Sequence, residues 1–301
     1  MVDIVVINWN AGDLLARCVH SVLQTGNRNL VDKLFIVDNF SSDNSINLLP
    51  VDEKIIIIRN TANLGFAKAC NQAFRQCSST FTLLLNPDAV LKDNTISECI
   101  TFMQNKPGVS IMGCRLLNDK GNTAPSCARF PKPLNIFYDA AGLSKLWPGL
   151  FKPATLMTDW DHLESKHVDQ VMGAFMFMRT SVFKSIGYFD ERYFVYFEEL
   201  DFSKKLADNG GVSFYNNEIS ITHTGGGTTS GVKAFRLYLF LNSRLLYSKK
   251  HFGLLGYYTV VFSTWMVEPF VRILYALGKM RFTEISEVTT ALRYLYRRKN
   301  G

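Results

Sequence analysis

Short apolar runs alternate with amphipathic stretches through the first hundred residues, and this alternation most constrains the fold. The runs are five or six residues long and rich in β-branched side chains, and they cover residues 4–8, 34–38, 54–59 and 81–85. Runs of this kind are typical of buried parallel strands. The stretches between them have helical spacing and cover residues 13–24, 67–76 and 94–103. This order predicts an α/β fold with a doubly wound sheet.

Asparagine and aspartate side chains gather where these predicted strands end. They are Asn8, Asn10, Asp38, Asn39, Asn63, Asn86 and Asp88. Because the carboxyl ends of the strands meet at one edge of such a sheet, the polar side chains can line a single crevice. Asn and Asp are also common in turns, which is the alternative explanation. Four successive strands that end in this way favour a binding site.

The regular pattern stops between Ala124 and Pro153, where five prolines predict an irregular insertion. Beyond it, residues 171–178 are a predicted buried strand. Residues 181–186 and 198–207 are predicted helices, and residues 212–215 and 219–223 two short strands. The chain then enters a glycine-rich loop, Thr224–Gly231, which lacks the ending of a P-loop.

The positive charge of the chain is concentrated in its last part. Residues 231–301 hold 12 Lys and Arg and 3 acids, a net charge of +9, whereas the preceding residues have a net charge of −2. A basic segment suggests an anionic surface as partner, either nucleic acid or membrane. Nucleic acid is not expected, because the body has no basic face and the chain has no nucleic-acid-binding motif.

The apolar segment Leu254–Val267 favours a membrane surface as this partner. It is too short to span a bilayer, and Glu268, Pro269 and Arg272 interrupt its continuation. Aromatic residues in it, beside later Lys and Arg residues, predict an amphipathic helix that lies in a membrane interface. The alternative is a helix that packs on the catalytic domain or on a second copy in a homo-oligomer.

The cysteines and the first residues indicate a cytoplasmic protein. The six cysteines are scattered without a C-x-x-C pair, so we expect reduced core residues and neither a disulfide framework nor a zinc site. The chain opens with an acidic, strand-like segment that has no basic region, so no signal peptide is expected.

Two acidic segments are candidates for chemistry. Asp88 follows a buried run directly, where a carboxylate can hold Mg²⁺ or Mn²⁺ against a diphosphate, and His223 precedes the glycine-rich loop as a candidate metal or phosphate ligand. Glu198, Glu199 and Asp201 begin a predicted helix after an aromatic run. Adjacent carboxylates raise one another's proton affinity, as a general base requires, although acids are also favoured in any first helical turn.

Together these segments resemble the inverting family 2 glycosyltransferases with the GT-A fold. Residues 5–10 are similar to the opening strand that touches the nucleotide base. Residues 36–43 are similar to the V-D-N-x-S-x-D segment, whose first Asp, here Asp38, binds the base. Asn63, Gly65 and Asn71 fall in a segment similar to N-x-G-F-A-x-x-x-N, and Asn86-Pro87-Asp88 takes the position of the metal-binding D-x-D motif with Asn as its first residue.

Residues 173–201 look most like the rhamnosyltransferase branch, in which the segment F-x-E-D-x-D supplies the catalytic base. Glu199 stands here in place of the second acid of that segment. The resemblance implies that Glu199, with Glu198 and Asp201, forms the catalytic group. It implies that Asp88 and His223 hold the metal. It also implies that a nucleotide sugar binds to eight further residues: Asn8, Asn10, Asp38, Asn39, Asn63, Gly65, Asn71 and Asn86.

The resemblance also implies an activity and a domain plan. The expected donor is dTDP-L-rhamnose and the expected acceptor a polyprenyl-diphosphate-linked saccharide, at the inner face of the cell membrane. A UDP-hexose or UDP-galactofuranose donor, or a sugar-nucleotide-binding module without catalysis, are the alternatives. Residues 1–231 form the expected GT-A domain, a Rossmann-like, doubly wound mixed sheet with a nucleotide-binding half (1–115) and an acceptor half (116–231). Residues 232–301 form a helical, amphipathic extension.

Overall fold

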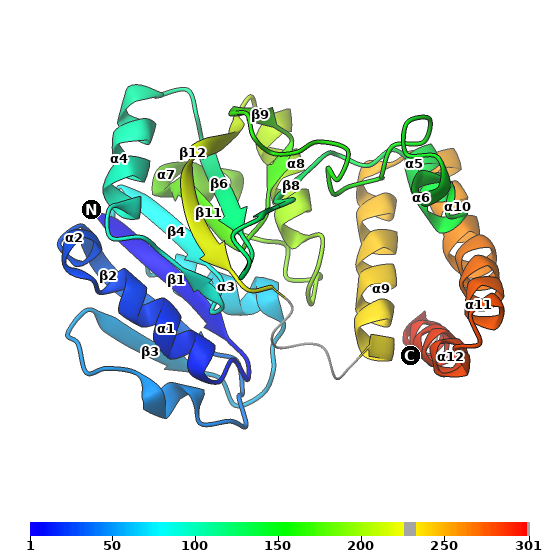
Figure 1. Ribbon diagram of the computed structural model, residues 1–301, viewed down its shortest axis with the longest axis horizontal. Coiled ribbons are helices and arrows are strands. Elements are labelled where there is room, and N and C mark those ends of the chain that lie inside the picture. The colour runs from blue at the N-terminus through cyan, green and yellow to red at the C-terminus, as the bar shows by residue number, and fades with distance from the viewer. Residues whose placement is uncertain (226–232, 300–301) are drawn as a thin grey trace. The chain divides into compact units, whose positions relative to one another are not determined.

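The chain divides into two compact units in the computed structural model, which describes residues 1–225 and 233–299 (Figure 1). Unit 1 comprises residues 1–128, 160–194 and 198–228, and unit 2 comprises residues 129–159, 195–197 and 229–301. The sequence prediction assigned residues 1–231 to one catalytic domain. By their contacts, residues 129–159 and 195–197 group with the C-terminal helices.

A mixed sheet forms the centre of unit 1. Its strands are β1 (Val2–Asn8), β2 (Val31–Asp38), β3 (Ile55–Arg59), β4 (Phe81–Leu85), β5 (Ala89–Val90), β6 (Ile111–Leu117), β7 (Thr123–Ala124), β9 (Lys166–Val168), β11 (Phe175–Arg179) and β12 (Ser213–His223). Their order is β3-β2-β1-β4-β11-β6-β12-β5, with β7 beside β6 and β9 beside β12. The first four strands are parallel, and β11 runs antiparallel to β4. Strands β8 (Cys127–Ala128) and β10 (Gln170–Val171) form a separate pair.

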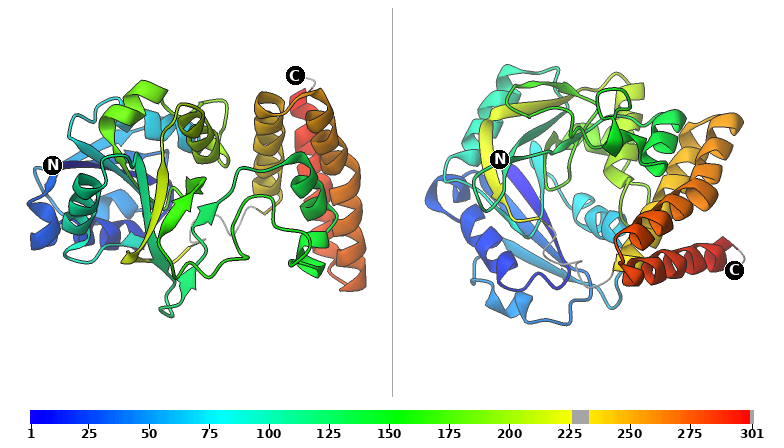
Figure 2. Two further views of the ribbon diagram at one scale, coloured as in Figure 1. Left: turned by 90° about the horizontal axis from the view of Figure 1, so that it is seen from above. Right: turned by 45° about the vertical axis from the view of Figure 1, so that its right-hand side comes forward.

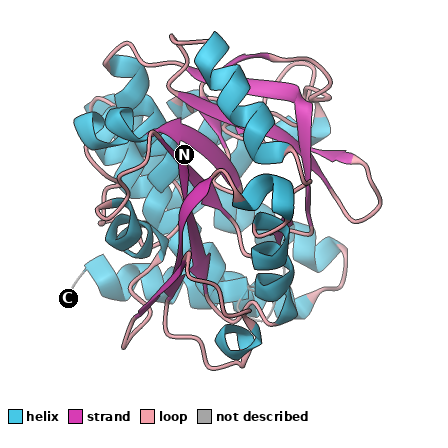
Figure 3. Cartoon of the chain, turned by 90° about the vertical axis from the view of Figure 1, so that its left-hand side faces the viewer, coloured by secondary structure: helices cyan, strands magenta, loops and turns pink. Residues whose placement is uncertain are grey.

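Helices cover the two faces of this sheet (Figure 3). They are α1 (Asp13–Val22), α2 (Thr25–Arg28), the 3₁₀ turn η1 (Ser45–Leu48), α3 (Phe66–Phe74), α4 (Thr95–Asn105), α7 (Thr180–Ile186) and α8 (Glu198–Asp208). Because strand side chains alternate between faces, Val2, Ile4 and Val6 share one core cluster with apolar residues of α1 and α4. Helices α3, α7 and α8 meet through the rings of Phe74, Phe183 and Phe202. The expected doubly wound α/β architecture is confirmed.

Three details of the later chain differ from the sequence prediction. The predicted strand 171–178 is split between β10 and β11, and the two predicted strands 212–215 and 219–223 are one strand, β12, with a register shift between Asn216 and Ser220. The segment predicted to be irregular contains helix α5 (Pro133–Ala140). Proline does not prevent that helix, because Pro133 occupies the first turn, where the missing N–H has no helical partner in any case.

Unit 2 consists of helices (Figure 2). They are α5, α6 (Leu143–Leu146), α9 (Lys233–His251), α10 (Leu254–Phe262), the π-helical turn η2 (Ser263–Val267), α11 (Glu268–Gly278) and α12 (Phe282–Lys299). Helix α10 packs against α5 and α9, and α12 packs against α9 and α11.

Elements α10, η2 and α11 form one continuous helix, so the predicted interruption at Glu268, Pro269 and Arg272 is wrong. The helix spans Leu254–Gly278 and is long and apolar enough to cross a membrane by length and composition alone. Pro269 lacks an N–H and its ring crowds the preceding turn, and the wider π turn just before it accommodates this without a break. Glu268 is neutralised by ion pairs with Arg244 and Arg272 at 2.6 and 2.7 Å.

All six cysteines are free and buried, as the sequence predicted. Burial raises the pKa of the Cys18 thiol, which keeps it protonated.

Candidate active site

The ends of strands β1 and β2 bring Asn8 and Asp38 together in unit 1. The two residues are paired in register, and Asn8 Nδ2 donates to Asp38 Oδ1 at 3.1 Å and to Ser45 Oγ at 2.8 Å. Asp38 Oδ1 also accepts from the Ser41 backbone N–H. Among the described residues no donor occupies Asp38 Oδ2, which leaves this oxygen able to accept a hydrogen bond from a ligand such as a nucleobase.

Asn10 links the loop after β1 to the loop after β2. It has a positive φ of 53°, a conformation that Asn tolerates better than most residues. Its backbone N–H donates to Ser41 Oγ at 3.0 Å, and its Oδ1 accepts from the Ser42 N–H at 2.8 Å. Asn10 therefore holds these two loops together through its own backbone and side chain.

Asn39, Asn63 and Gly65 form a second cluster beside the first. Asn39 Nδ2 donates to Asn63 Oδ1 at 2.9 Å, and the Gly65 N–H donates to the same oxygen at 3.0 Å. Gly65 has a φ of +84°, and a Cβ atom there would lie 2.5 Å from the Phe194 carbonyl oxygen. Only glycine fits this close approach, which brings the loop against the segment that leads towards α8.

Asn71 stands apart from these clusters. Its Nδ2 donates to the Phe189 carbonyl at 2.9 Å and to Glu191 Oε1 at 3.0 Å, and its Oδ1 accepts from the Phe189 N–H at 3.1 Å. The side chain is buried and its amide is fully used inside the protein. It fixes the turn ahead of α8, and its predicted contact with a nucleotide sugar remains a prediction.

Asp88 and His223 meet where β5 pairs with the end of β12. His223 Nε2 lies 3.2 Å from Asp88 Oδ1 and 3.3 Å from Asn86 Nδ2, and the Gly225 N–H donates to Asp88 Oδ2 at 3.0 Å. Burial alone raises the pKa of Asp88, but the hydrogen bond and charge of His223 and the Gly225 N–H outweigh it, so this pKa is lowered. Asp88 is therefore ionised at neutral pH.

This pair fits a divalent cation in one specific way. Carboxylate oxygen and imidazole nitrogen are ligands for Mn²⁺, and the carboxylate suits Mg²⁺. Within the described residues no group of three or more His, Cys, Asp and Glu side chains could hold a metal. A cation bound by this pair needs further oxygen ligands. Substrate phosphates commonly supply them at sites where the protein provides only one or two carboxylates. The rest of the predicted glycine-rich loop, residues 226–231, lies outside the described residues.

Glu198 and Glu199 begin helix α8 and have raised pKa values. Glu198 is buried, its Oε2 has no hydrogen-bond partner in the described part of the chain, and burial together with the charge of Glu199 raises its pKa well above the usual range. Burial raises the pKa of Glu199 to about 7. Glu198 is accordingly the protonated member of the pair at neutral pH, and Glu199, which is partly exposed, is the one that can exchange a proton.

Gly173 holds the Glu199 carboxylate in place. Its backbone N–H donates to that carboxylate, and a Cβ atom at residue 173 would lie 2.2 Å from Glu199 Oε1. The predicted site did not include Gly173. A glycine inside the predicted strand 171–178 was the available sign, because an isolated glycine in a strand often marks a close approach of another group to the backbone.

Asp201 serves the interior of unit 1. It is fully buried and accepts from the Tyr193 hydroxyl at 3.5 Å, and its Oδ2 lies 3.9 Å from Lys205 Nζ. These contacts anchor the first turns of α8, and the predicted catalytic role of Asp201 remains a prediction.

Backbone hydrogen bonds connect the segment of the Asp88–His223 pair to the segment that contacts the Glu198–Glu199 pair. The Asn86 N–H donates to the Ala174 carbonyl at 3.1 Å, next to Gly173, and the paired strands β4 and β11 continue this contact with Leu85 opposite Phe175. The Asn39 N–H donates to the Asn8 carbonyl at 2.8 Å and joins the two asparagine clusters in the same way. Within unit 1, the predicted asparagine, aspartate and glycine residues other than Asn71 and Asp201 thus lie along one set of strand ends with His223, and Glu199 of α8 reaches this edge at Gly173.

Comparison with known proteins identifies the group to which this arrangement belongs. Residues 3–187, more than half of the chain, match the family described as Glycosyl transferase family 2. The chain belongs to this family.

Two relatives match this chain over most of its length. An N-acetylglucosaminyl-diphospho-decaprenol L-rhamnosyltransferase from Mycobacterium tuberculosis is 24% identical over 268 residues, which cover 81% of this chain and 85% of the relative. The low-salt glycan biosynthesis hexosyltransferase Agl10 from Haloferax volcanii is 28% identical over 256 residues, or 81% and 77% of the two chains.

Solved structures identify the fold of this glycosyltransferase. The mannosyltransferase PcManGT from Pyrobaculum calidifontis, solved in complex with GDP-Man and Mn²⁺, superposes with a TM-score of 0.57 at 12% identity, covering 98% of this chain and 86% of that one. The expected GT-A fold with a helical C-terminal region is confirmed. At these identities the comparisons support the family, and the rhamnosyltransferase branch stays a prediction.

Proposed function

We propose that this family 2 glycosyltransferase transfers L-rhamnose from dTDP-L-rhamnose to a polyprenyl-diphosphate-linked saccharide, with inversion at the anomeric carbon. The observation that carries the proposal is the Glu199 carboxylate held on the Gly173 N–H with a pKa raised to about 7. A carboxylate with that proton affinity is suited to take a proton from a hydroxyl group near neutral pH. It lies one short link from Asn86 and the Asp88–His223 pair.

The reaction is a single displacement. Glu199 accepts the proton of the acceptor hydroxyl while the oxygen attacks the anomeric carbon from the face opposite the nucleotide. A new carbon–oxygen bond forms, the bond to the diphosphate breaks, and its electron pair leaves with the nucleoside diphosphate. Glu198 stays protonated beside it, so that only one of the two carboxylates carries charge.

The remaining residues hold the donor. Asp88 and His223 are the side chains that would hold Mg²⁺ or Mn²⁺, which when bound neutralises charge on the departing diphosphate. Asp38 Oδ2 accepts from the base. Asn8, Asn10, Asn39, Asn63 and Gly65 maintain the loops around base and ribose.

The names of the relatives support the choice of donor and acceptor. The mycobacterial relative is a rhamnosyltransferase whose name specifies an N-acetylglucosaminyl-diphospho-decaprenol acceptor, and the archaeal relative is a glycan biosynthesis hexosyltransferase. By analogy the protein acts in the assembly of a bacterial cell-surface polysaccharide. We place it in the cytoplasm, with the basic, aromatic helices of unit 2 on the inner face of the membrane that holds a lipid-linked acceptor.

A donor panel tests the proposal directly. Purified full-length protein with Mn²⁺ is given a GlcNAc-diphosphate lipid in detergent and, separately, dTDP-L-rhamnose, UDP-glucose, UDP-galactose and UDP-galactofuranose. Product is measured by mass spectrometry, and the anomeric configuration by NMR. We expect transfer from dTDP-L-rhamnose at a kcat/KM at least tenfold above any UDP sugar, with inversion and with loss of activity in EDTA.

Other outcomes point to the alternatives. Transfer from a UDP sugar with dTDP-L-rhamnose inert keeps the fold and the mechanism but changes the donor. Binding of a sugar nucleotide with neither transfer nor hydrolysis, unchanged by Glu199→Gln, contradicts the enzyme and supports a binding module.

A further inference from the structure

One face of the helix Leu254–Gly278 exposes apolar side chains along its whole length. Six of them recur every fourth residue and are each 52–79% exposed: Leu254, Tyr258, Phe262, Met266, Phe270 and Leu274. We call this set the apolar stripe. Such a continuous apolar surface is unusual on a protein that meets only water.

The opposite face of the same helix is fixed inside unit 2. Ser263 and Thr264 are fully buried, and Arg244 of α9 donates to Thr264 Oγ1 at 2.7 Å and to Glu268 Oε2 at 2.6 Å. This buried ion pair holds the helix lengthwise against its neighbours. The stripe is therefore presented as the outer face of an anchored helix, as in helices that lie flat in a membrane interface.

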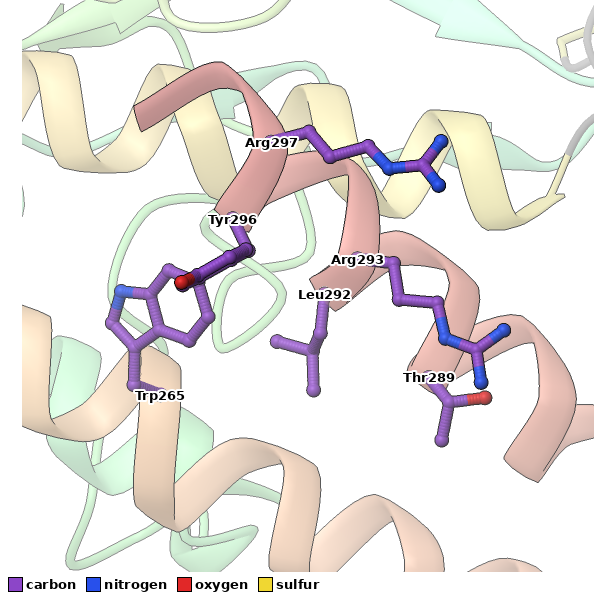
Figure 4. Close-up of a pocket in the computed structure, with 6 residues that line it drawn as sticks. All are labelled: Trp265, Thr289, Leu292, Arg293, Tyr296 and Arg297. Carbon is purple, nitrogen blue, oxygen red and sulfur yellow. The ribbon is translucent and has the colours of Figure 1, made fainter. Parts of the chain in front are cut away.

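A groove of about 460 Å³ opens beside the stripe, between η2 and α12 (Figure 4). It is lined by Trp265, Thr289, Leu292, Arg293, Tyr296 and Arg297. Trp265 adjoins the stripe residue Met266 in sequence and projects from η2 towards Tyr296 of α12. The groove thus combines aromatic rings, one aliphatic side chain and two guanidinium groups.

The two arginines of the groove lack acidic partners in the described chain. Arg293 and Arg297 are four residues apart on α12, so they share one helix face, and like charges at this spacing repel. The three acids of residues 233–299 pair with other cations: Glu268 with Arg244, Glu284 with Arg281, and Glu287 with Lys233. Within this range the groove has two positive charges and no carboxylate among its lining residues.

We propose that this groove binds the phosphate head group of an anionic membrane phospholipid while the stripe rests among the outer parts of the acyl chains. Arginine is suited to bind phosphate oxygens in pairs, and Trp and Tyr favour the head-group level of a bilayer. The net charge of +9 over residues 231–301 matches an anionic surface. The inference rests on the membrane attachment proposed above and is independent of the transferred sugar.

Vesicle sedimentation of the full-length protein tests the groove. Vesicles of phosphatidylcholine alone are compared with vesicles that contain 30% phosphatidylglycerol, a composition chosen for the assay. For the double variant Arg293→Gln/Arg297→Gln we expect about 30-fold weaker binding to the anionic vesicles, on the order expected for two cations near such a surface. Binding to phosphatidylcholine should be unchanged. The matched control Lys106→Gln/Lys120→Gln removes two exposed charges from unit 1 and should bind as the native protein does.

A second readout follows the groove itself. The fluorescence of Trp265 is obtained as the difference between the emission of the native protein and that of Trp265→Phe. This emission should shift to shorter wavelength when anionic vesicles are added. It should not respond to 10 mM inorganic phosphate, a concentration also chosen for the assay, if the ligand is a lipid head group. A response to inorganic phosphate that saturates and prevents vesicle binding would instead assign the groove to a free anion and overturn the lipid.

The outcomes separate the two proposals. Equal binding of the native protein and the arginine variant to anionic vesicles overturns the groove but leaves membrane attachment intact. No binding of the native protein to either vesicle overturns attachment and the groove together. Transfer activity of both proteins in detergent is measured alongside, and its loss in every protein would count against the proposed reaction alone.

Discussion

Asp88, which follows strand β4, and Glu199, in the first turn of helix α8, are two acidic residues of unit 1 whose pKa values are shifted in opposite directions. Asp88 is bonded by His223 and the Gly225 N–H, which lower its pKa in spite of burial. The Glu199 carboxylate has the N–H groups of Gly173 and of its own backbone as donors, and burial raises its pKa to about 7 in spite of them. One acid is thus kept charged, as the proposed cation ligand must be, and the other can exchange a proton, as the proposed base must. The surroundings make this difference, since the two side chains have nearly the same chemistry.

The largest effect expected from this contrast is that of Glu199→Gln. The amide keeps the size of the side chain but cannot accept the proton, so kcat should fall by about 10³-fold, within the range found for general bases. Donor affinity, measured by calorimetry with Mn²⁺, should stay within twofold. The exposed Glu218→Gln serves as control and should retain full activity. A Gln variant as active as the native protein would assign the base to another residue.

Asp88→Asn should have the next largest effect and a different signature. Loss of the charged ligand should lower kcat by about 10²-fold, on the order expected when one electrostatic contact to a leaving group is removed. Unlike Glu199→Gln, it should also weaken Mn²⁺-dependent donor binding. If donor binding of this variant remains unchanged with and without Mn²⁺, Asp88 is not a metal ligand.

The raised pKa of Glu199 predicts the acid limb of the pH profile. Because the carboxylate form is the base, kcat/KM should fall about tenfold per pH unit below pH 7 and reach a plateau above it. Glu199→Asp, whose shorter arm leaves a base in place, should keep an acid limb at reduced rate. Glu199→Gln should lose the limb. A native profile that is flat between pH 5 and pH 8 would contradict the proton affinity assigned to Glu199.

The smallest effect concerns how Gly173 places the carboxylate. In Gly173→Ala the new Cβ would lie 2.2 Å from Glu199 Oε1, so the carboxylate must move. We expect kcat to fall by about tenfold. This is less than the roughly 100-fold loss that a catalytic group misplaced by about 1 Å can cause. Gly108→Ala is the matched control, because a Cβ there meets nothing within 4 Å. Equal kcat values for the two variants would show that the Gly173 contact is not needed for activity.

The order of residues along the chain was sufficient to predict the α/β fold and to select polar residues that the strand ends bring together. Each apolar run in the first hundred residues became a strand, although β3 at the edge of the sheet is only half-buried, and the Asn and Asp residues mark where these strands end. The family resemblance of the same residues specified the GT-A fold within this class. The pattern was insufficient where a residue's role depends on a distant partner. Asn86 and His223 are 137 residues apart, and nothing local indicates that β5 and β12 bring them together.

Tertiary structure alone decided the remaining features. The sequence contains Gly173 and Glu199 but not their contact, and burial at that contact raises the pKa of the glutamate. Asn71 and Asp201 match the family pattern, yet packing turns both towards the interior, where their polar atoms satisfy neighbouring groups. Glu268, Pro269 and Arg272 were predicted to interrupt the apolar segment, but the π turn and the Glu268–Arg244 ion pair keep the helix continuous. Local sequence determines which segments become strands and helices, whereas proton affinity, contact and exposure depend on which of those segments pack together.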